Sequence, residues 1–525
     1  MRDTNDWDAI VIGAGLAGLS CAAHLAKAGR RVVVIEQTAK PGGLWSSFSR
    51  RGFIFDLSTH WVTEPQTLNR MLEDLGGPPV DFIQLEHLGR YVGPVATRGS
   101  AGAPGAPPPP RSAAAVPAWD FTVGPDAKAF KDAVRAQFPA AVDASLDKLV
   151  EDAIEISRCV DSLPTASPEL TPLWSRLRTT ISMAVRTRRL RSLSRMPADE
   201  YLARLFPGEE LSGLRAALHT LAPIAGVPSI GLLAILGTGL RGRLYAPRGG
   251  AQVLSDAFAE AARRNGVEIR FCRRATSILA ESKRVQGVTL DDGVELRAQA
   301  VISAADAKQT FYRLLGRERV PDSYKKLLEA QPVSEPYGLI SLVTTIEPAS
   351  LGLGDTDVFI CPSNEMPRAL ESVEPEDCLF AMIFPRYTEP GADTTERAIQ
   401  IVARAAYAWR EHWETYPTPE RGDEYYALKE EWAGKIIARA QEYIPRLSSH
   451  LVQTDVATPI TFYRYTSNTD GAPVGWHYAG QRRWKQRVPF VRGLYQAGHW
   501  VGPSGAVPVT RSGKWAAELV LKDLG

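Results

Sequence analysis

A glycine-rich run near the start of the sequence constrains the fold more than any other feature. Residues 10–18 join an apolar stretch to a helical run, and a second apolar stretch then ends in Glu36. The order strand, glycine turn, helix, strand and acid is typical of a unit that binds a dinucleotide. Gly13 permits the tight turn, Gly15 lets a pyrophosphate approach the backbone, and Gly18 lets the helix pack closely on the strand.

The first turn of the predicted helix provides polar groups for the bound molecule. Leu16 and Ala17 stand at its start, where backbone N–H groups are free and the positive end of the helix dipole favours phosphate oxygens. Glu36 follows about 20 residues later, where its carboxylate can accept hydrogen bonds from ribose hydroxyls. We therefore predict a dinucleotide site in this part of the chain.

The residues after Glu36 favour FAD over a nicotinamide dinucleotide. A second glycine pair is followed by the run 52–60, and this extension resembles that of the two-dinucleotide-binding-domain flavoproteins, in which the pair lies along FAD. Four residues here are predicted cofactor contacts: Gly42, Gly43, Leu44 and Trp45. The alternative is a glycine turn followed by an ordinary hairpin.

A segment near the end of the sequence fits the same cofactor. Residues 493–500 predict a strand that leads into a glycine turn at Gly498, and a helix follows. In this class of flavoprotein such a segment passes under the FAD, and the helix start, here Ala506 and Val507, points at the flavin. The helix dipole would stabilise negative charge on the reduced flavin. Two motifs that most of the chain separates are therefore predicted to form one site.

Further segments between these motifs complete a family resemblance. Residues 245–254 precede a predicted helix, 266–271 and 285–290 predict strands, and 301–306 close the unit. The chain resembles the phytoene desaturase and carotenoid isomerase family, including its retinol-saturase-like members, over most of its length.

The resemblance implies a two-domain FAD oxidoreductase fold that is related to the amine oxidases. It implies hydride transfer or double-bond isomerisation on long, conjugated, apolar substrates, and it places Ala275 among the cofactor contacts. The chain departs from the family pattern at Leu44, Ser58 and His499, where arginine, glycine and an acid respectively are common. These departures leave the substrate class open.

The predicted fold class is α/β, with a Rossmann-like FAD domain of the two-dinucleotide-binding type and a discontinuous α+β substrate domain. The FAD domain is expected to combine three segments, 1–92, 243–316 and 490–525. Residues 93–117 are rich in proline, alanine and glycine and predict an exposed loop inserted into a hairpin. The substrate domain is expected to combine a helical part, 118–242, with a mixed part, 317–489.

Hydrophobic patterns give elements for the mixed part of the substrate domain. Strands are predicted at 337–345 and 378–384, and helices at 394–413 and 430–443. Such a sheet is expected to cover the flavin.

The span 170–240 raises the question of membrane contact. Residues 170–198 contain seven arginines and no acid, which fits either a basic interfacial helix on anionic lipid or a solvated helix pair. Residues 216–240 carry no charged side chain, but their prolines and glycines argue against a single membrane span. We expect a buried helical pair there that could line an apolar substrate tunnel.

Composition excludes several other classes. Apolar residues make up 44% of the 525 residues and charged residues 23%, and the net charge of +2 predicts no nucleic-acid partner. The five cysteines show no metal-ligand spacing, and we predict no metal site. The first residues lack the apolar core of a signal peptide, so we expect a cytoplasmic protein with possible peripheral membrane contact.

Candidate catalytic residues stand close to both cofactor motifs. His60 follows the first, His499 and Trp500 follow the turn at Gly498, and histidine suits proton transfer near neutral pH. The alternative for each is a packing role. Further candidates with a weaker claim are Trp61, Tyr463, Trp476 and His477.

Three functions are compatible with these residues. The first is an FAD-dependent desaturase or isomerase of an extended hydrophobic polyene. The second is an FAD dehydrogenase or oxidase of a smaller amine or secondary-metabolite intermediate, for which the tyrosines and tryptophans of 463–484 would suit an aromatic substrate. The third is a non-catalytic prenyl-binding escort protein of the same broad fold, against which the retained glycine motifs argue.

Overall fold

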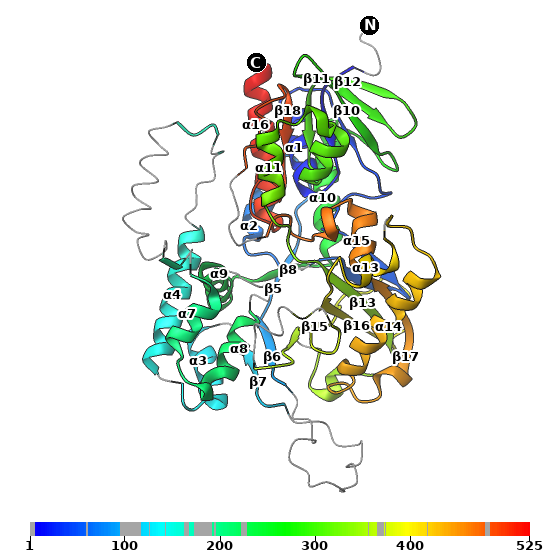
Figure 1. Ribbon diagram of the computed structural model, residues 1–525. Helices are drawn as coiled ribbons and strands as arrows, with labels where there is room; N and C mark the ends of the chain where they lie inside the picture. The colour runs from blue at the N-terminus through cyan, green and yellow to red at the C-terminus, as the bar shows by residue number, and fades with distance from the viewer. Residues whose placement is uncertain are drawn as a thin grey trace.

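The computed structural model describes residues 6–58, 61–94, 117–124, 126–141, 143–161, 167, 169–172, 192–193, 196–221, 228–354, 356–364, 372, 374–416, 418–477 and 484–525. A parallel sheet with helices lies at the top of Figure 1, a second sheet lies at lower right, and a helical group lies at lower left. His60 and the prediction for it lie outside the described residues, as do most of 93–117 and of the basic stretch 170–198.

The first sheet has the order β10-β11-β12-β1-β2-β9, and β18 also pairs with β12. Its five parallel strands are β18 (Leu494–Gln496), β12 (Glu295–Ser303), β1 (Asp6–Ile12), β2 (Val32–Ile35) and β9 (Glu268–Arg270). The antiparallel strands β10 (Ala275–Glu281) and β11 (Arg284–Leu290) extend it. Strands from both ends of the sequence therefore meet on β12, as a Rossmann-like cofactor domain requires.

Both faces of this sheet are covered, which explains why β1 and β2 are almost continuously apolar. On one face pack α1 (Leu16–Lys27), α10 (Ala251–Arg264) and α16 (Ala506–Leu524). Gly513 lets α16 lie directly on α1, because a Cβ at this position would stand 2.1 Å from the carbonyl oxygen of Ala17. Residues of β1, β2, β10 and β11 on the other face share a core with the helical turn at Gln309–Leu314 and with α11 (Asp322–Ala330).

The second sheet has the order β17-β13-β16-β15-β14-β6-β7 and is antiparallel except for the pair β14–β6. Its strands are β17 (Leu451–Ala457), β13 (Tyr337–Thr344), β16 (Arg397–Arg404), β15 (Phe380–Ile383), β14 (Val358–Ile360), β6 (Gly89–Val92) and β7 (Asp120–Val123). Ile340 and Leu342 of β13 and Ile401 of β16 point to α14 (Asp423–Ala440). The residues that alternate with them along each strand point to the opposite face of the sheet.

The helix predicted at 394–413 is wrong, because β16 occupies its centre and only the short helix α13 (Arg410–Glu414) follows. Residues 398–401 are buried on both faces of the sheet, so β16 lacks the polar alternation that identifies a half-buried strand. A short, fully buried strand of this kind cannot be distinguished from a buried helix by periodicity.

The helical group contains α3 (Ala127–Gln137), α4 (Asp143–Asp161), α7 (Ala198–Leu205), α8 (Ser212–His219) and α9 (Ser229–Leu240). Helix α9 lies against α4, and Gly237 makes this possible because its Cβ would stand 1.9 Å from the carbonyl oxygen of Ala153. Of the pair of helices expected within 216–240, α9 is present, and the end of α8 reaches His219. Over the described ranges of the chain, no helix is long and apolar enough to cross a membrane.

Short elements connect these layers. Strands β3 (Ser47–Arg50) and β4 (Phe53–Asp56) form a hairpin, and β5 (Phe82–Gln84) pairs with β8 (Tyr245–Pro247). Figure 1 shows β5 and β8 between the cofactor domain and the other two groups. Helices α2 (Pro65–Asp74) and α15 (Pro459–Thr466) complete the connections. Strands β6 and β7, which flank the predicted loop 93–117, pair antiparallel.

Candidate functional site

One cavity of about 1340 Å³ runs from the glycine turns of the cofactor domain to the second sheet and to α9. This volume is larger than the range of about 300–1,000 Å³ that is usual for a site that binds one small molecule. The cavity is therefore large enough for a dinucleotide together with a second molecule.

The two glycine pairs form one cradle at the first end of this cavity. Gly42 donates its N–H to the carbonyl oxygen of Ala14 (2.9 Å), which sets the second pair beside the first. A Cβ at Gly15 would approach only Gly42 O, at 3.9 Å, and a Cβ at Gly43 would approach Gly15 Cα at 3.7 Å. The backbone here is therefore open toward the cavity, as close approach of a pyrophosphate requires.

Glu36 closes the cradle at the end of β2. Its Oε2 accepts the N–H of Ala14 (2.8 Å), and its Oε1 accepts the N–H and the hydroxyl of Thr38 (2.8 and 2.7 Å). The side chain is 7% exposed and lines the cavity. Because a carboxylate has about four acceptor positions, capacity remains for one ribose hydroxyl.

The C-terminal segment approaches the cavity at a glycine turn. Gly498 has φ +95° and donates its N–H to Ser512 Oγ (3.0 Å), which ties the turn to α16. Gly498 and Gly505 line the cavity, whereas Ala506 and Val507 are buried in the core beside α1. At the start of α16 the cavity is lined by Ser504, Gly505 and Val509, and contact of Ala506 and Val507 with the cofactor stays a prediction.

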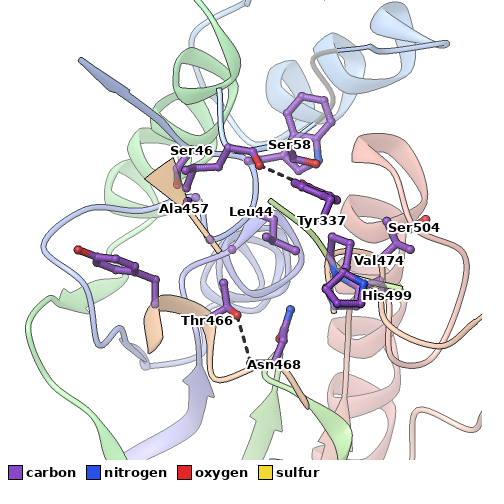
Figure 2. Close-up of a pocket in the computed structure, with 18 of the residues that line it drawn as sticks. Leu44, Ser46, Ser58, Tyr337, Ala457, Thr466, Asn468, Val474, His499 and Ser504 are labelled. Atoms are coloured by element: carbon purple, nitrogen blue, oxygen red, sulfur yellow. Dashed lines mark hydrogen bonds between the residues drawn. The ribbon is translucent and has the colours of Figure 1, made fainter. Parts of the chain in front are cut away.

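His499 is the histidine of the cavity wall among the described residues (Figure 2). Its Nε2 is buried and has no hydrogen-bond partner in the described part of the chain. Gly475 packs directly on it, since a Cβ there would stand 2.6 Å from His499 Cδ2. Trp500 lies behind His499, with ring centroids 5.4 Å apart, and is absent from the cavity lining.

Burial lowers the pKa of His499 from 6.5 to about 4, so the ring is neutral at pH 7. The unfolded chain protonates at the higher pKa, so stability from His499 is complete above about pH 6.5 and is lost as the pH falls toward 4. Between pH 7 and pH 4.5 we expect the stability difference between the wild type and His499→Phe to change by about 2–3 kcal/mol. Urea unfolding at both pH values measures it.

The comparison with His499→Phe is necessary because other groups titrate in the same range. Burial lowers the pKa of His24 and His219 in the same direction, and burial raises the pKa of Asp306 to about 6, which has the opposite effect on stability. These groups contribute equally to both proteins. An unchanged stability difference at the two pH values would contradict a neutral, buried His499.

Most predicted cofactor residues line this one cavity: Gly13, Gly15, Leu16, Ala17, Glu36, Gly42, Gly43, Leu44, Trp45, Ala275 and Gly498. Gly18 lies beneath the turn, where a Cβ would stand 2.0 Å from the carbonyl oxygen of Gly13. Of the weaker candidates, Trp61 lines the cavity and Trp476 packs against Trp500. The contacts of the predicted cofactor residues with FAD stay predictions.

A sheet over the flavin and helices beside a tunnel were expected, but the individual residues of the far wall of the cavity were not predicted. One face of the second sheet provides Leu339, Ala381 and Val402, and α9 provides a stripe on the opposite side. That stripe is Ala234, Ile235 and Thr238, three partly buried residues between fully buried neighbours. The uncharged character of α9 was the available signal, but β13, β15 and β16 become one wall only through strand pairing.

Residues 16–521 match the sequence profile of a family described as flavin containing amine oxidoreductase. The chain belongs to this family. It is 25% identical to all-trans-retinol 13,14-reductase of Danio rerio over 90% of this chain and 78% of that one.

Two further comparisons agree with this assignment. Chloroplastic prolycopene isomerase of Arabidopsis thaliana is 25% identical over 99% of this chain and 83% of that one. The crystal structure of an oxidoreductase from Methanosarcina mazei superposes with a TM-score of 0.60 at 17% identity, covering 97% and 100% of the two chains. The second likeness shows that these two proteins share a fold.

The family member is an FAD-dependent oxidoreductase of the α/β class. The residues present fit FAD, because the glycine cradle lacks the side chains that would fill it and Glu36 retains acceptor capacity. We expect Gly13, Gly15 and Gly43 to lie against the pyrophosphate and Glu36 to bind a ribose.

Proposed function

We propose that this oxidoreductase transfers hydride between FAD and an extended, apolar, conjugated molecule, as a desaturase, a reductase or a cis-trans isomerase. The observation that carries this proposal is the apolar wall of the cavity beyond the cofactor cradle. The names of its relatives, a retinol reductase and a prolycopene isomerase, support the same class of substrate.

The wall consists of one continuous row across five paired strands. The row comprises Ala457, Leu339, Val402, Ala381 and Phe359, which strand pairing places side by side in this order. All five residues line the cavity, and the stripe on α9, which belongs to the helical group, lines it too. A conjugated hydrocarbon has no polar groups to satisfy, so burial against such a wall is favoured by removal of apolar surface from water.

FAD supplies the hydride chemistry when bound, and the residues of this chain hold and dehydrate the substrate. The apolar row and the α9 stripe exclude water from the reacting carbon atoms. His499 is neutral at pH 7, so it adds an uncharged ring to the cavity wall.

The proposal is tested with the purified holoenzyme under anaerobic conditions. Phytoene is added to the oxidised protein, and prolycopene or all-trans-retinol is added after reduction with dithionite. We expect loss of the oxidised flavin spectrum in the first case, or an isomerised or hydrogenated product in the second. No response to any polyene, together with bleaching by a small amine, would favour the alternative, an oxidase or dehydrogenase of a smaller intermediate.

Ala234→Trp provides a matched control for this experiment. Ala234 lines the cavity from α9 and lies outside the cofactor cradle. The indole ring of the variant therefore narrows only the part of the cavity that is proposed to hold the substrate. We expect normal FAD content with at least about a tenfold lower response to the polyene, because overpacking removes the space that the substrate needs.

A further inference from the structure

We infer that Ser341 and Gln400 form a recognition site for a hydroxyl group, so that the substrate is an elongated apolar molecule that carries one. This inference rests on the proposed function and narrows its substrate class. It assigns the two residues a role in specificity and leaves the reaction itself unchanged.

The two residues lie next to the apolar row on the same face of the sheet. Ser341 pairs directly with Gln400 across β13 and β16, and Asp455 of β17 is the other neighbour of Ser341. All three side chains line the cavity. The polar row therefore lies two residues along each strand from the apolar row that holds Leu339 and Val402.

The hydrogen bonds of this pair leave one acceptor and one donor unused. Gln400 is 2% exposed, and its Nε2 donates to Asp56 O (3.0 Å) and to Ser341 Oγ (3.4 Å). Its Oε1 has no partner among the residues that the structure describes. Ser341 is 3% exposed and accepts from Gln400, and within the same residues its hydroxyl donates to nothing. A substrate hydroxyl is both a donor and an acceptor, so it matches these two groups together.

A role in strand packing alone does not account for the pair. The bond from Nε2 to Asp56 O ties β4 to the sheet, but this tie uses only one end of the amide. A hydrocarbon in the cavity would cover Oε1 and leave it without a hydrogen bond, which disfavours that ligand. A site that hydrogen-bonds a hydroxyl therefore discriminates against the analogue that lacks it.

The same row argues against a cationic ligand. Asp455 is its only acidic member, and Arg50 Nε binds its Oδ2 at 2.9 Å while Gln453 Nε2 binds the same oxygen at 2.7 Å. The charge of Asp455 is therefore largely compensated before a substrate arrives. The neutral amide of Gln400 and the hydroxyl of Ser341 therefore remain the groups in this row that need a hydrogen-bond partner.

The test compares matched ligands on the holoenzyme by equilibrium titration of the flavin absorbance. One pair is all-trans-retinol and the hydrocarbon in which hydrogen replaces its hydroxyl, and the other is zeaxanthin and β-carotene. We expect the wild type to bind the hydroxylated member of each pair more tightly than the hydrocarbon. Gln400→Leu is expected to reduce that ratio about three- to tenfold, the usual value of one hydrogen bond.

Two further variants separate recognition from folding. Val402→Ala lines the same cavity two residues along β16 and is expected to weaken both members of a pair equally. Ser341→Ala keeps the bond from Gln400 to Asp56 O and is expected to reduce the ratio by a smaller factor, so it carries the test if Gln400→Leu does not retain FAD.

The outcomes distinguish this inference from the proposed function. Binding of both pairs with ratios that neither variant changes would overturn the hydroxyl site and leave the polyene proposal intact. Binding of no polyene at all would overturn both. Tighter binding of all-trans-retinylamine than of all-trans-retinol would assign the polar row to an amine and would also overturn the hydroxyl site.

Discussion

Gly18→Ala is expected to yield a protein that does not retain FAD and whose free energy of unfolding is lower by about 3 kcal/mol or more. The new Cβ would stand 2.0 Å from the carbonyl oxygen of Gly13 and 3.2 Å from Val11 Cγ1. Both contacts are to the strand and turn that hold the cradle, so α1 has to move away from β1. Flavin content after purification and denaturant unfolding of the apoprotein measure the two effects.

Gly434→Ala is the matched control. Gly434 lies exposed in the middle of α14, and a Cβ there meets no atom within 4 Å. The same chemical change should raise stability by about 0.5–1 kcal/mol, because alanine loses less backbone freedom in a helix. Equal effects of the two substitutions would refute close packing of α1 on the turn.

Glu36→Ala is expected to weaken FAD binding at least about a hundredfold, the equivalent of about 3 kcal/mol. The substitution removes the acceptor of the Ala14 N–H and of both donors of Thr38. The turn at one end of the cradle and the loop after β2 then lose the group that joins them. Reconstitution of the apoprotein with FAD, followed by flavin fluorescence, gives the dissociation constant.

Glu36→Gln separates shape from charge at this position. The amide has nearly the same volume, but its NH₂ group faces a backbone N–H where the carboxylate offers an oxygen. We expect an affinity between those of the wild type and Glu36→Ala. Affinities for FAD within about threefold of the wild type in both variants would show that Glu36 serves the fold and not the cofactor.

The cofactor cradle could be predicted because its information is local. The strand, turn, helix and acid all lie within 10–36, and the pairing of glycines 15 and 42 adds one short loop. The start of the C-terminal helix was predicted to approach the cofactor, and its N-cap Gly505 lines the cavity, whereas contacts of Ala506 and Val507 with a cofactor stay predictions.

The substrate wall escaped prediction because it arises from strand register. Ser341 and Gln400 are 59 residues apart and become neighbours only when β13 pairs with β16. The mistaken helix at 394–413 removed β16 from the expected sheet, and with it Gln400 and Val402. In the uncharged segment 216–240, α9 is a helix that lines the cavity, which agrees with the helical interpretation of that part of the segment.

The hydrogen bond from Ser20 Oγ to Thr510 O joins residues that are 490 positions apart. During synthesis, β1 and α1 leave the ribosome long before β18 and α16 exist, so the apolar face of α1 stays without its partner for most of translation. We therefore expect FAD to be retained only after α16 has packed on α1. A chain whose two ends have not yet met is expected to expose the apolar face of α1 and to aggregate.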